Sequence, residues 1–292
     1  MKTLFAIFIL LPLMLSGCGT LISKRGTDIH WYGGFTPGDA QKLRQKLGPD
    51  TRRLIITSPG GVAEEFIDVA HIVQERGITV QVKDYCASAC AFLFLAAKER
   101  VLPDDAFLAF HASPQDIAFS NLTREQAEQF FGSDAATNEY AVAMRKQLAA
   151  FRRDLREIFE RAGVSADLYD KLILLERVAP GSMKMKPGSI KRDSSQEGET
   201  THISARFEWT SCGRRGWIPD QDGLTGIGAR LAQPYKRPPE EAIARKMHMK
   251  EKDLLFQRID DLTEVACKTS SEAKNPSAQT EARRADHPPA ER

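Results

Sequence analysis

Residues 53–61 read RLIITSPGG, an apolar run that ends in a turn of Ser, Pro and two glycines. Arg53–Thr57 has the length and the β-branched residues of a buried strand. In the next stretch four apolar residues recur at helical spacing: Phe66, Val69, Ala70 and Val73. This spacing predicts an amphipathic helix, which ends at Gly77. A strand, a turn and a helix in this order form the βα unit from which parallel sheets are built.

The same alternation extends on both sides of this unit. On the N-terminal side we expect a strand at 29–35 and a helix at 37–47. On the C-terminal side we expect a strand at 78–82, a buried helix at 89–97, and short strands at 100–102 and 106–111. A long helical pattern follows at 134–161, and a shorter one from 165 to 176. The basic residues of the long helix, Arg152 among them, should form a solvated face or contact anionic headgroups or a partner. The sequence therefore predicts an α/β fold with stacked βαβ units, a largely parallel sheet and a helical arm after residue 111.

Three short motifs fall at the ends of the predicted strands. The glycine pair of the Ser-Pro-Gly-Gly turn can leave backbone N–H groups free to face a ligand. Ser88, within CASAC (86–90), lies where a helix begins, and a helix N-terminus favours negative charge. His111 follows the last strand of the run. Taken singly, each motif is more often structural: a plain turn, a helix N-cap and a core histidine.

Together these motifs resemble the ClpP/crotonase superfamily, and most closely its ClpP-like serine peptidase branch. The residues that carry the resemblance are Ile56-Thr57-Ser58-Pro59-Gly60-Gly61, Ala87-Ser88-Ala89 and Phe110-His111. Their order and spacing, and the strand–helix pattern between them, agree with that branch. The variant with cysteines on either side of the serine resembles a group of exported bacterial ClpP-like proteins. The resemblance covers about residues 29–178.

The resemblance implies a role for each matching residue. Ser88 would be the nucleophile and His111 the general base, because a serine hydroxyl needs an adjacent base to attack a carbonyl. An imidazole suits this task, since its pKa lies close to the working pH. The N–H groups of Gly61 and Ala89 would form the oxyanion hole.

The third member of a catalytic triad does not follow the family pattern in this chain. The family places an aspartate about fifty residues after the histidine, beyond a short helix. The matching position here falls near Glu176, and Asp170 is the alternative. Either carboxylate could orient His111, or both could be ordinary surface charges, in which case activity would be low or absent.

The N-terminus has the features of an exported lipoprotein. A positive start at Lys2 is followed by about a dozen apolar residues, too few to span a bilayer core of about 30 Å. The sequence Leu15-Ser16-Gly17-Cys18 resembles the lipobox of bacterial lipoproteins, in which Cys18 would be lipidated with fatty acyl chains such as palmitate after removal of residues 1–17. The alternative is an ordinary secretory signal. We therefore expect a membrane-anchored protein that faces the periplasm, on the outer rather than the inner membrane.

The remaining cysteines are compatible with an oxidising compartment. Cys86 and Cys90 would form a disulfide across the nucleophile turn or remain as two buried thiols. A zinc site built from these two cysteines and His111 is a less favoured alternative, because the spacing has no second pair. No cofactor or metal is predicted.

Amino-acid composition and sequence pattern divide the chain further. We expect a signal peptide at 1–17, a tether at 18–28 and a ClpP-like domain at 29–178. A divergent extension at 179–235 contains a candidate strand (202–209), and a charged, largely disordered tail at 236–292 contains one candidate helix. The formal net charge of +2 gives no argument for nucleic-acid binding.

The expected function is serine-type peptide hydrolysis at the cell envelope, with an envelope peptide or protein as substrate. Homo-oligomerisation is expected from the resemblance, because related peptidases form rings. The alternative is a catalytically inactive ClpP-like lipoprotein that binds a peptide or a protein partner. Export away from cytosolic CoA argues against a crotonase-type acyl-CoA enzyme.

Overall fold

The computed structural model describes residues 20–122, 124–133, 138–176, 178, 182–195, 198–208 and 213–259. The predicted signal peptide, Cys18, which is the predicted site of lipidation, and residues 260–292 lie outside this range. No helix in the described ranges combines the length and the apolar character that crossing a membrane requires.

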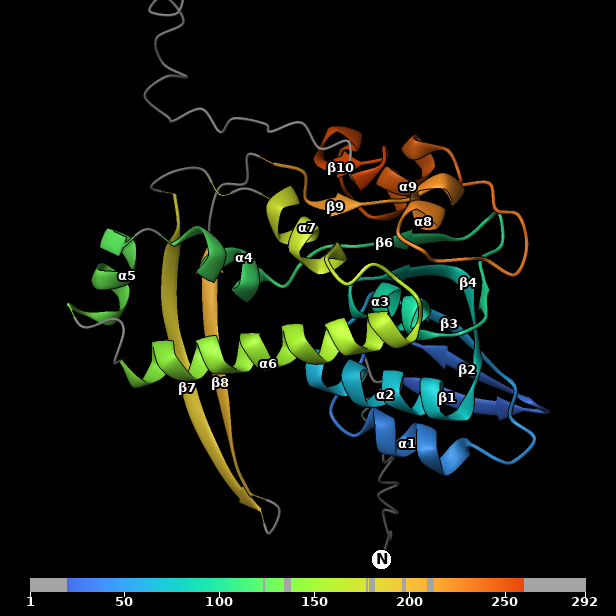
Figure 1. Cartoon of the computed structure of the whole chain (residues 1–292), viewed down its shortest axis with the longest axis horizontal. Coiled ribbons are helices and arrows are strands. Elements are labelled where there is room, and N and C mark those ends of the chain that lie inside the picture. Colours follow the sequence, from blue (N-terminus) through green and yellow to red (C-terminus); the bar gives the residue numbers. More distant parts are fainter. Residues whose placement is uncertain are drawn as a thin grey trace, which may run out of the picture.

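A six-stranded, mostly parallel sheet forms the centre of the molecule, as the strand–helix alternation predicts (Figure 1). Its strands are β1 (Leu21–Arg25), β2 (Asp28–Tyr32), β3 (Arg53–Ser58), β4 (Thr79–Ala87), β5 (Arg100–Val101) and β6 (Phe107–Ala109). β1 runs antiparallel to β2, and the other pairs are parallel. β4 is longer than expected because its first half pairs with β5 and its second half pairs with β6.

The helices cover the sheet and form an arm beside it. They are α1 (Asp39–Lys46), α2 (Ala63–Arg76), α3 (Ala89–Ala96), α4 (Pro114–Asn121), α5 (Arg124–Phe131), α6 (Glu139–Arg161) and α7 (Leu168–Leu175). Every residue of α3 is buried, which agrees with its lack of polar side chains. α6 packs against α2 and α3, and Figure 1 shows it extending from them toward α5 and the hairpin.

Two parts of the chain are more ordered than the sequence predicts. The expected tether contains β1, which adds an antiparallel edge strand to β2. The part of the expected extension and tail at 213–259 folds into β9 (Gly216–Trp217), α8 (Gln221–Gly226), α9 (Glu240–Lys246), the 3₁₀ turn η1 (Glu251–Asp253) and β10 (Leu254–Leu255). Its apolar residues, Trp217 and Leu224 among them, are buried against the main domain. Their burial offsets the ordering cost that the polar composition suggested.

A long antiparallel hairpin joins the arm to this C-terminal part. Its strands are β7 (Lys184–Ser195), which the sequence did not predict, and β8 (Gly198–Glu208), which includes most of the candidate strand. β8 contacts α4 and α6, and Figure 1 shows the hairpin crossing α6 and extending beyond it.

The C-terminal ends of α3 and α6 are connected by the side chains of Arg100, which is buried, and Gln74, which is half-buried. The guanidinium of Arg100 donates to the carbonyls of Leu95 and Ala162. The side-chain amide of Gln74 donates to the carbonyls of Ala96 and Ile158. These contacts satisfy carbonyl groups that a helix end leaves without a partner.

Candidate active site

Ser88 occupies a strained turn between β4 and α3. Its backbone has φ 55° and ψ −128°, a conformation that non-glycine residues rarely adopt. The backbone N–H of Ser88 donates to Ala109 of β6 at 2.8 Å, and the Ser88 carbonyl accepts the N–H groups of Ala91 and Phe92. The side chain makes no helix-capping hydrogen bond. The Ser88 hydroxyl is therefore not used as an N-cap. The strained backbone conformation of Ser88 is of a kind that is typical of functional positions.

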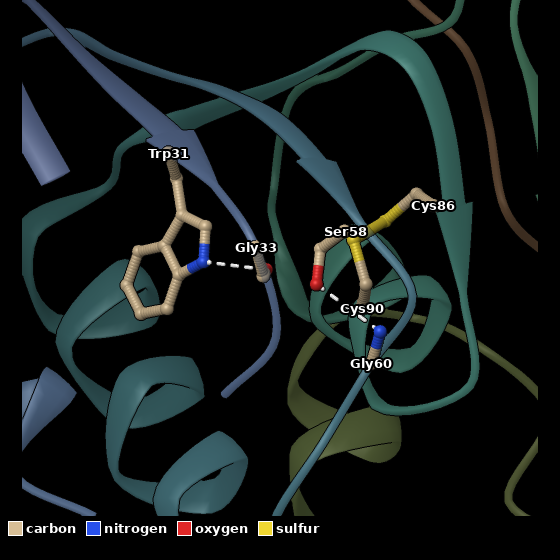
Figure 2. The surroundings of a disulfide bond; sticks show 6 residues. All are labelled: Trp31, Gly33, Ser58, Gly60, Cys86 and Cys90. Atoms are coloured by element: carbon tan, nitrogen blue, oxygen red, sulfur yellow. Dashed lines mark hydrogen bonds between the residues drawn. A yellow bond between two sulfur atoms is a disulfide. The ribbon is translucent and has the colours of Figure 1, made fainter. Parts of the chain in front are cut away.

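A disulfide closes the two sides of this turn. Cys86, near the end of β4, and Cys90, in the first turn of α3, are bonded with their Cα atoms 5.1 Å apart. This is the first of the two states considered from the sequence. Figure 2 shows the disulfide beside the loop that contains Ser58 and Gly60. With both sulfurs in this bond, neither cysteine is available as a thiolate ligand for zinc.

Gly60 lies in close contact with the same turn. A Cβ atom on Gly60 would lie 2.6 Å from the Cβ of Ser88 and 2.8 Å from the carbonyl oxygen of Ala87. The Ser58 hydroxyl, fully buried, accepts the N–H of Gly60 at 3.1 Å and holds this loop in place (Figure 2). The Ser-Pro-Gly-Gly segment thus supports the Ser88 turn sterically, and its own backbone is held by Ser58.

His111 is placed by the pairing of β4 with β6. Ala87 pairs with Ala109, so the residues after the two strands, Ser88 and His111, emerge at the same end of the sheet. Phe110 is bonded on both sides of its backbone to Trp217, with both N···O distances 2.8 Å. The C-terminal segment therefore fixes the residue immediately before His111.

The hydrogen bond of His111 determines its neutral tautomer. Nδ1 lies 2.8 Å from the carbonyl oxygen of Ala112, and a carbonyl can only accept a hydrogen bond, so Nδ1 carries the proton. Nε2 is then left as the acceptor, as a general base requires. Burial lowers the pKa of His111 and the positive charge of Arg215 lowers it further, against the opposing effect of the Ala112 hydrogen bond.

Ser88 and His111 line a common cavity of about 390 Å³. Gly61 and Ala89, the residues expected to form an oxyanion hole, line it as well. Within the described ranges, neither of their N–H groups has a backbone acceptor, and no hydrogen bond joins Ser88 to His111 directly. Catalytic hydrogen bonds are often formed only when substrate is bound. The structure thus brings together four of the residues singled out from the sequence.

The packing of the protein requires a glycine at position 61. A Cβ atom on Gly61 would lie 2.3 Å from the carbonyl oxygen of Phe35. Phe35 forms a parallel bridge with Gly61, and Val62 donates its N–H to the Phe35 carbonyl at 3.0 Å. Close backbone packing therefore excludes a side chain at this position.

A buried carboxylate that the sequence analysis did not select holds the loop after His111. Asp116 is fully buried and accepts hydrogen bonds from the Tyr169 hydroxyl at 2.7 Å and from Arg152 Nε at 2.6 Å. Ser113 donates its N–H to the Tyr169 oxygen at 3.0 Å. Burial and the charge of Asp116 raise the pKa of Tyr169, so its hydroxyl keeps the proton that it donates.

A local signal for Asp116 is present in the sequence. The Ser113 hydroxyl accepts the N–H of Asp116 at 3.0 Å and caps α4, as expected for the Ser-x-x-acid pattern at a helix start. The sequence alone does not show that Arg152 and Tyr169, 36 and 53 residues further along, would meet this carboxylate.

The two candidates for the third triad residue occupy different environments. Glu176, at the end of α7, is buried and lines a second cavity, of about 540 Å³, together with His111. Asp170 is half exposed, lines neither cavity and lies 3.6 Å from Arg156. Glu176, and not Asp170, therefore lines a cavity together with His111, whose Nδ1 is bonded to a backbone carbonyl.

The comparisons with known proteins do not identify this chain. No family model matches it, and no curated protein matches it significantly. In the described part of the chain, no group of His, Cys, Asp or Glu side chains has the arrangement of a metal site.

Proposed function

We propose that this protein is a serine-type peptide hydrolase of the ClpP-like class. The observation that carries the proposal is the strained Ser88 turn, whose hydroxyl shares one cavity with His111 and with the N–H groups of Gly61 and Ala89. A nucleophile on a strained strand-to-helix turn beside a base and two backbone donors is the arrangement that acyl transfer requires. The stacked strand–helix order and the motifs at residues 56–61, 87–89 and 110–111 support the ClpP/crotonase type of fold.

The proposed reaction uses these groups in two steps. The Ser88 oxygen attacks the peptide carbonyl carbon while its proton passes to Nε2 of His111, and the Gly61 and Ala89 N–H groups stabilise the oxyanion. Collapse of this intermediate breaks the C–N bond, and the amine leaves with the proton from His111. Water then attacks the acyl ester, with His111 again accepting and returning a proton, to release a carboxylic acid and free Ser88. The carbonyl of Ala112 orients the ring, and the Glu176 carboxylate stabilises the transient imidazolium.

A fluorophosphonate probe tests this proposal directly. We expect the full chain to be labelled, and Ser88→Ala and His111→Ala to lose labelling, because the probe reacts only with an activated serine. Ser113 lines the same cavity, so the labelled peptide must be mapped by mass spectrometry to distinguish the two hydroxyls. A folded wild type that is never labelled would contradict the hydrolase and favour the alternative, an inactive peptide- or partner-binding protein.

We also propose that the protein is exported and anchored through Cys18. The Cys86–Cys90 disulfide supports export, since stable disulfides are rare in reducing compartments. Metabolic labelling with a fatty acid should modify the wild type but not Cys18→Ser. Recovery of the unmodified wild type from a soluble periplasmic fraction would contradict lipid anchoring and favour an ordinary secretory signal.

A further inference from the structure

His111 separates two cavities, and the proposed reaction assigns a role to only one of them. The first contains Ser88, Gly61 and Ala89, and so accommodates the carbonyl that is attacked. The second, of about 540 Å³, is lined by His111 and by Pro59 and Ala87, the residues that precede the glycine pair and the nucleophile. The group that leaves takes its proton from His111, so it must lie on the histidine side of the attacked carbonyl. The second cavity is the space available to it there.

The walls of the second cavity are largely apolar. Tyr85 and Phe107 stack with their ring centres 6.1 Å apart, and Met247 and Met249 approach from the segment that follows α9. Flexible methionine side chains adapt to ligands of different shapes. An apolar wall of this kind suits peptide side chains without selecting one residue type.

The charged groups of this cavity, in contrast, suggest a preference among peptide substrates by their charge. Its lining includes two cations, Arg215 and Lys246, and one acid, Glu176. Lys246 forms an ion pair with Asp84. Among the described residues, the side chain of Arg215 has neither a hydrogen bond nor an ion pair. Its positive charge lowers the pKa of His111. Arg215 is therefore an exposed guanidinium that lines the same cavity as His111 and is available for an anion.

We propose that the second cavity receives the leaving-group side of a peptide substrate and that Arg215 binds a carboxylate there. A guanidinium offers paired donors that match a carboxylate. The inference rests on the proposed hydrolase and adds its substrate preference: peptides that carry a carboxylate shortly after the bond that is cut. After cleavage, the released fragment has its new amine at His111 and its carboxylate at Arg215.

Binding of a carboxylate also changes the electrostatics at His111. Besides Arg215, the ionisable groups that line a cavity with the imidazole are two acids, two tyrosines and one lysine: Glu64, Glu176, Tyr85, Tyr169 and Lys246. A carboxylate on Arg215 offsets the positive charge that lowers the pKa of His111, so this pKa should rise on binding. The substrate would thereby make His111 a stronger base.

Binding to the full-length Ser88→Ala variant tests the proposal without requiring catalysis. The probes are acetyl-tetra-alanine with a free C-terminal carboxylate and the same peptide as the amide. We expect the acid to bind about tenfold more tightly than the amide, from a charge-assisted hydrogen bond. Adding Arg215→Gln should remove this difference. A third peptide, an amide with an internal Asp, distinguishes a side-chain carboxylate from a terminal one, and tight binding of either anion supports the proposal.

Arg214 provides a matched control for Arg215. Its side chain donates to the carbonyl of Lys252, and it does not line the cavity, so Arg214→Gln should keep the preference for the acid. Equal binding of acid and amide, or a preference that survives Arg215→Gln, would overturn the proposal. An NMR titration of His111 gives a second readout, because Arg215→Gln should raise its pKa and Arg214→Gln should not. Since none of these measurements needs turnover, failure of the carboxylate site is distinguishable from failure of the hydrolase.

Discussion

The two sides of the candidate active site are held in place by different means. The Ser88 turn is fixed by nearby parts of the sequence: a disulfide between Cys86 and Cys90, which are four positions apart, and the close approach of Gly60. His111 depends on distant parts, because its loop is held by Asp116 with Arg152 and Tyr169, and its strand by Trp217. Ser88 is therefore positioned locally and His111 through tertiary contacts, so different substitutions should damage each side.

The largest effect is expected from removing the carboxylate that holds the His111 loop. Asp116→Ala leaves the buried Tyr169 hydroxyl and the Arg152 guanidinium without their acceptor, and should lower the free energy of unfolding by about 3 kcal/mol. Urea denaturation measures this change. Asp154→Ala, which removes an exposed pair with Arg153, should change it by less than about 0.5 kcal/mol. Equal effects of the two variants would show that the buried network does not hold the loop.

A somewhat smaller loss is expected on the Ser88 side from Gly60→Ala. The added Cβ would meet the Ser88 Cβ at 2.6 Å, and the cost should be about 2–3 kcal/mol together with loss of probe labelling at Ser88. Gly26 has a positive φ of 59° but no atom within 4 Å of an added Cβ. Gly26→Ala should therefore cost only the backbone strain, about 1 kcal/mol, and keep labelling. Retained labelling in Gly60→Ala would argue against steric support of the turn.

Removing the disulfide should cost about 2 kcal/mol, as expected for a short covalent loop. The double variant Cys86→Ala/Cys90→Ala avoids unpaired buried polar groups. We expect it to react more slowly with the fluorophosphonate, while hydrogen exchange of the amides around Asp116 stays unchanged. Slower labelling with increased exchange at Asp116 would mean that the two sides of the site are not independent.

A change at Glu176 should affect rate more than stability. Glu176→Gln removes the carboxylate that lines a cavity with His111 and should lower kcat/KM by about tenfold, equivalent to about 1.4 kcal/mol. Asp170→Asn, at the half-exposed position, should leave kcat/KM unchanged. The opposite ranking would restore Asp170 as the acid that assists His111.

The smallest effect concerns pH. Burial and the charge of Arg215 lower the pKa of His111 below 6.5. His111 therefore stays neutral down to a lower pH than an ordinary histidine, and kcat/KM should stay constant down to that lower pH. The same shift means that the unfolded chain binds more protons, so stability falls as pH decreases from 6.5 through the folded pKa. A pH–rate profile measures the first effect, and Arg215→Gln should move its acidic limb to higher pH. An acidic limb already at pH 6.5 or above in the wild type would contradict this expectation.

The contrast between the two sides also explains what could be predicted from the sequence. β3, α2 and α3 follow from apolar patterns within single segments, and the α/β class follows from their order. Cys86 and Cys90 flank Ser88 in the chain, so their pairing was among the expected states. Arg152 was expected on a solvated basic face of its helix, and the structure instead pairs it with buried Asp116. Such pairings depend on contacts between distant segments, which spacing alone does not encode.

The C-terminal segment illustrates the same limit. The only strand expected in the extension at 179–235 was 202–209, but Trp217, beyond it, bonds to Phe110 and packs on it with ring centres 5.4 Å apart. The candidate helix of the tail was expected at about 239–265. In its described part, up to residue 259, the only α-helix is α9, because the helix ends at Met247 and the chain returns to pair β10 with β9. A two-residue strand has almost no periodicity, so neither β9 nor β10 leaves a signal in the sequence.

The contacts of Arg100 and Gln74 have a mechanical consequence. α3 begins at Ser88, and α6 forms a wall of the cavity that contains it. Burial lowers the pKa of Arg100 to about 10, which still leaves it charged at neutral pH. Its charge faces the negative ends of both helix dipoles, and Gln74 links the same two ends from α2. Ser88 and this wall are thus linked through the two side chains, and we expect a ligand to be accommodated by side-chain rotation more than by movement of α6 relative to α3.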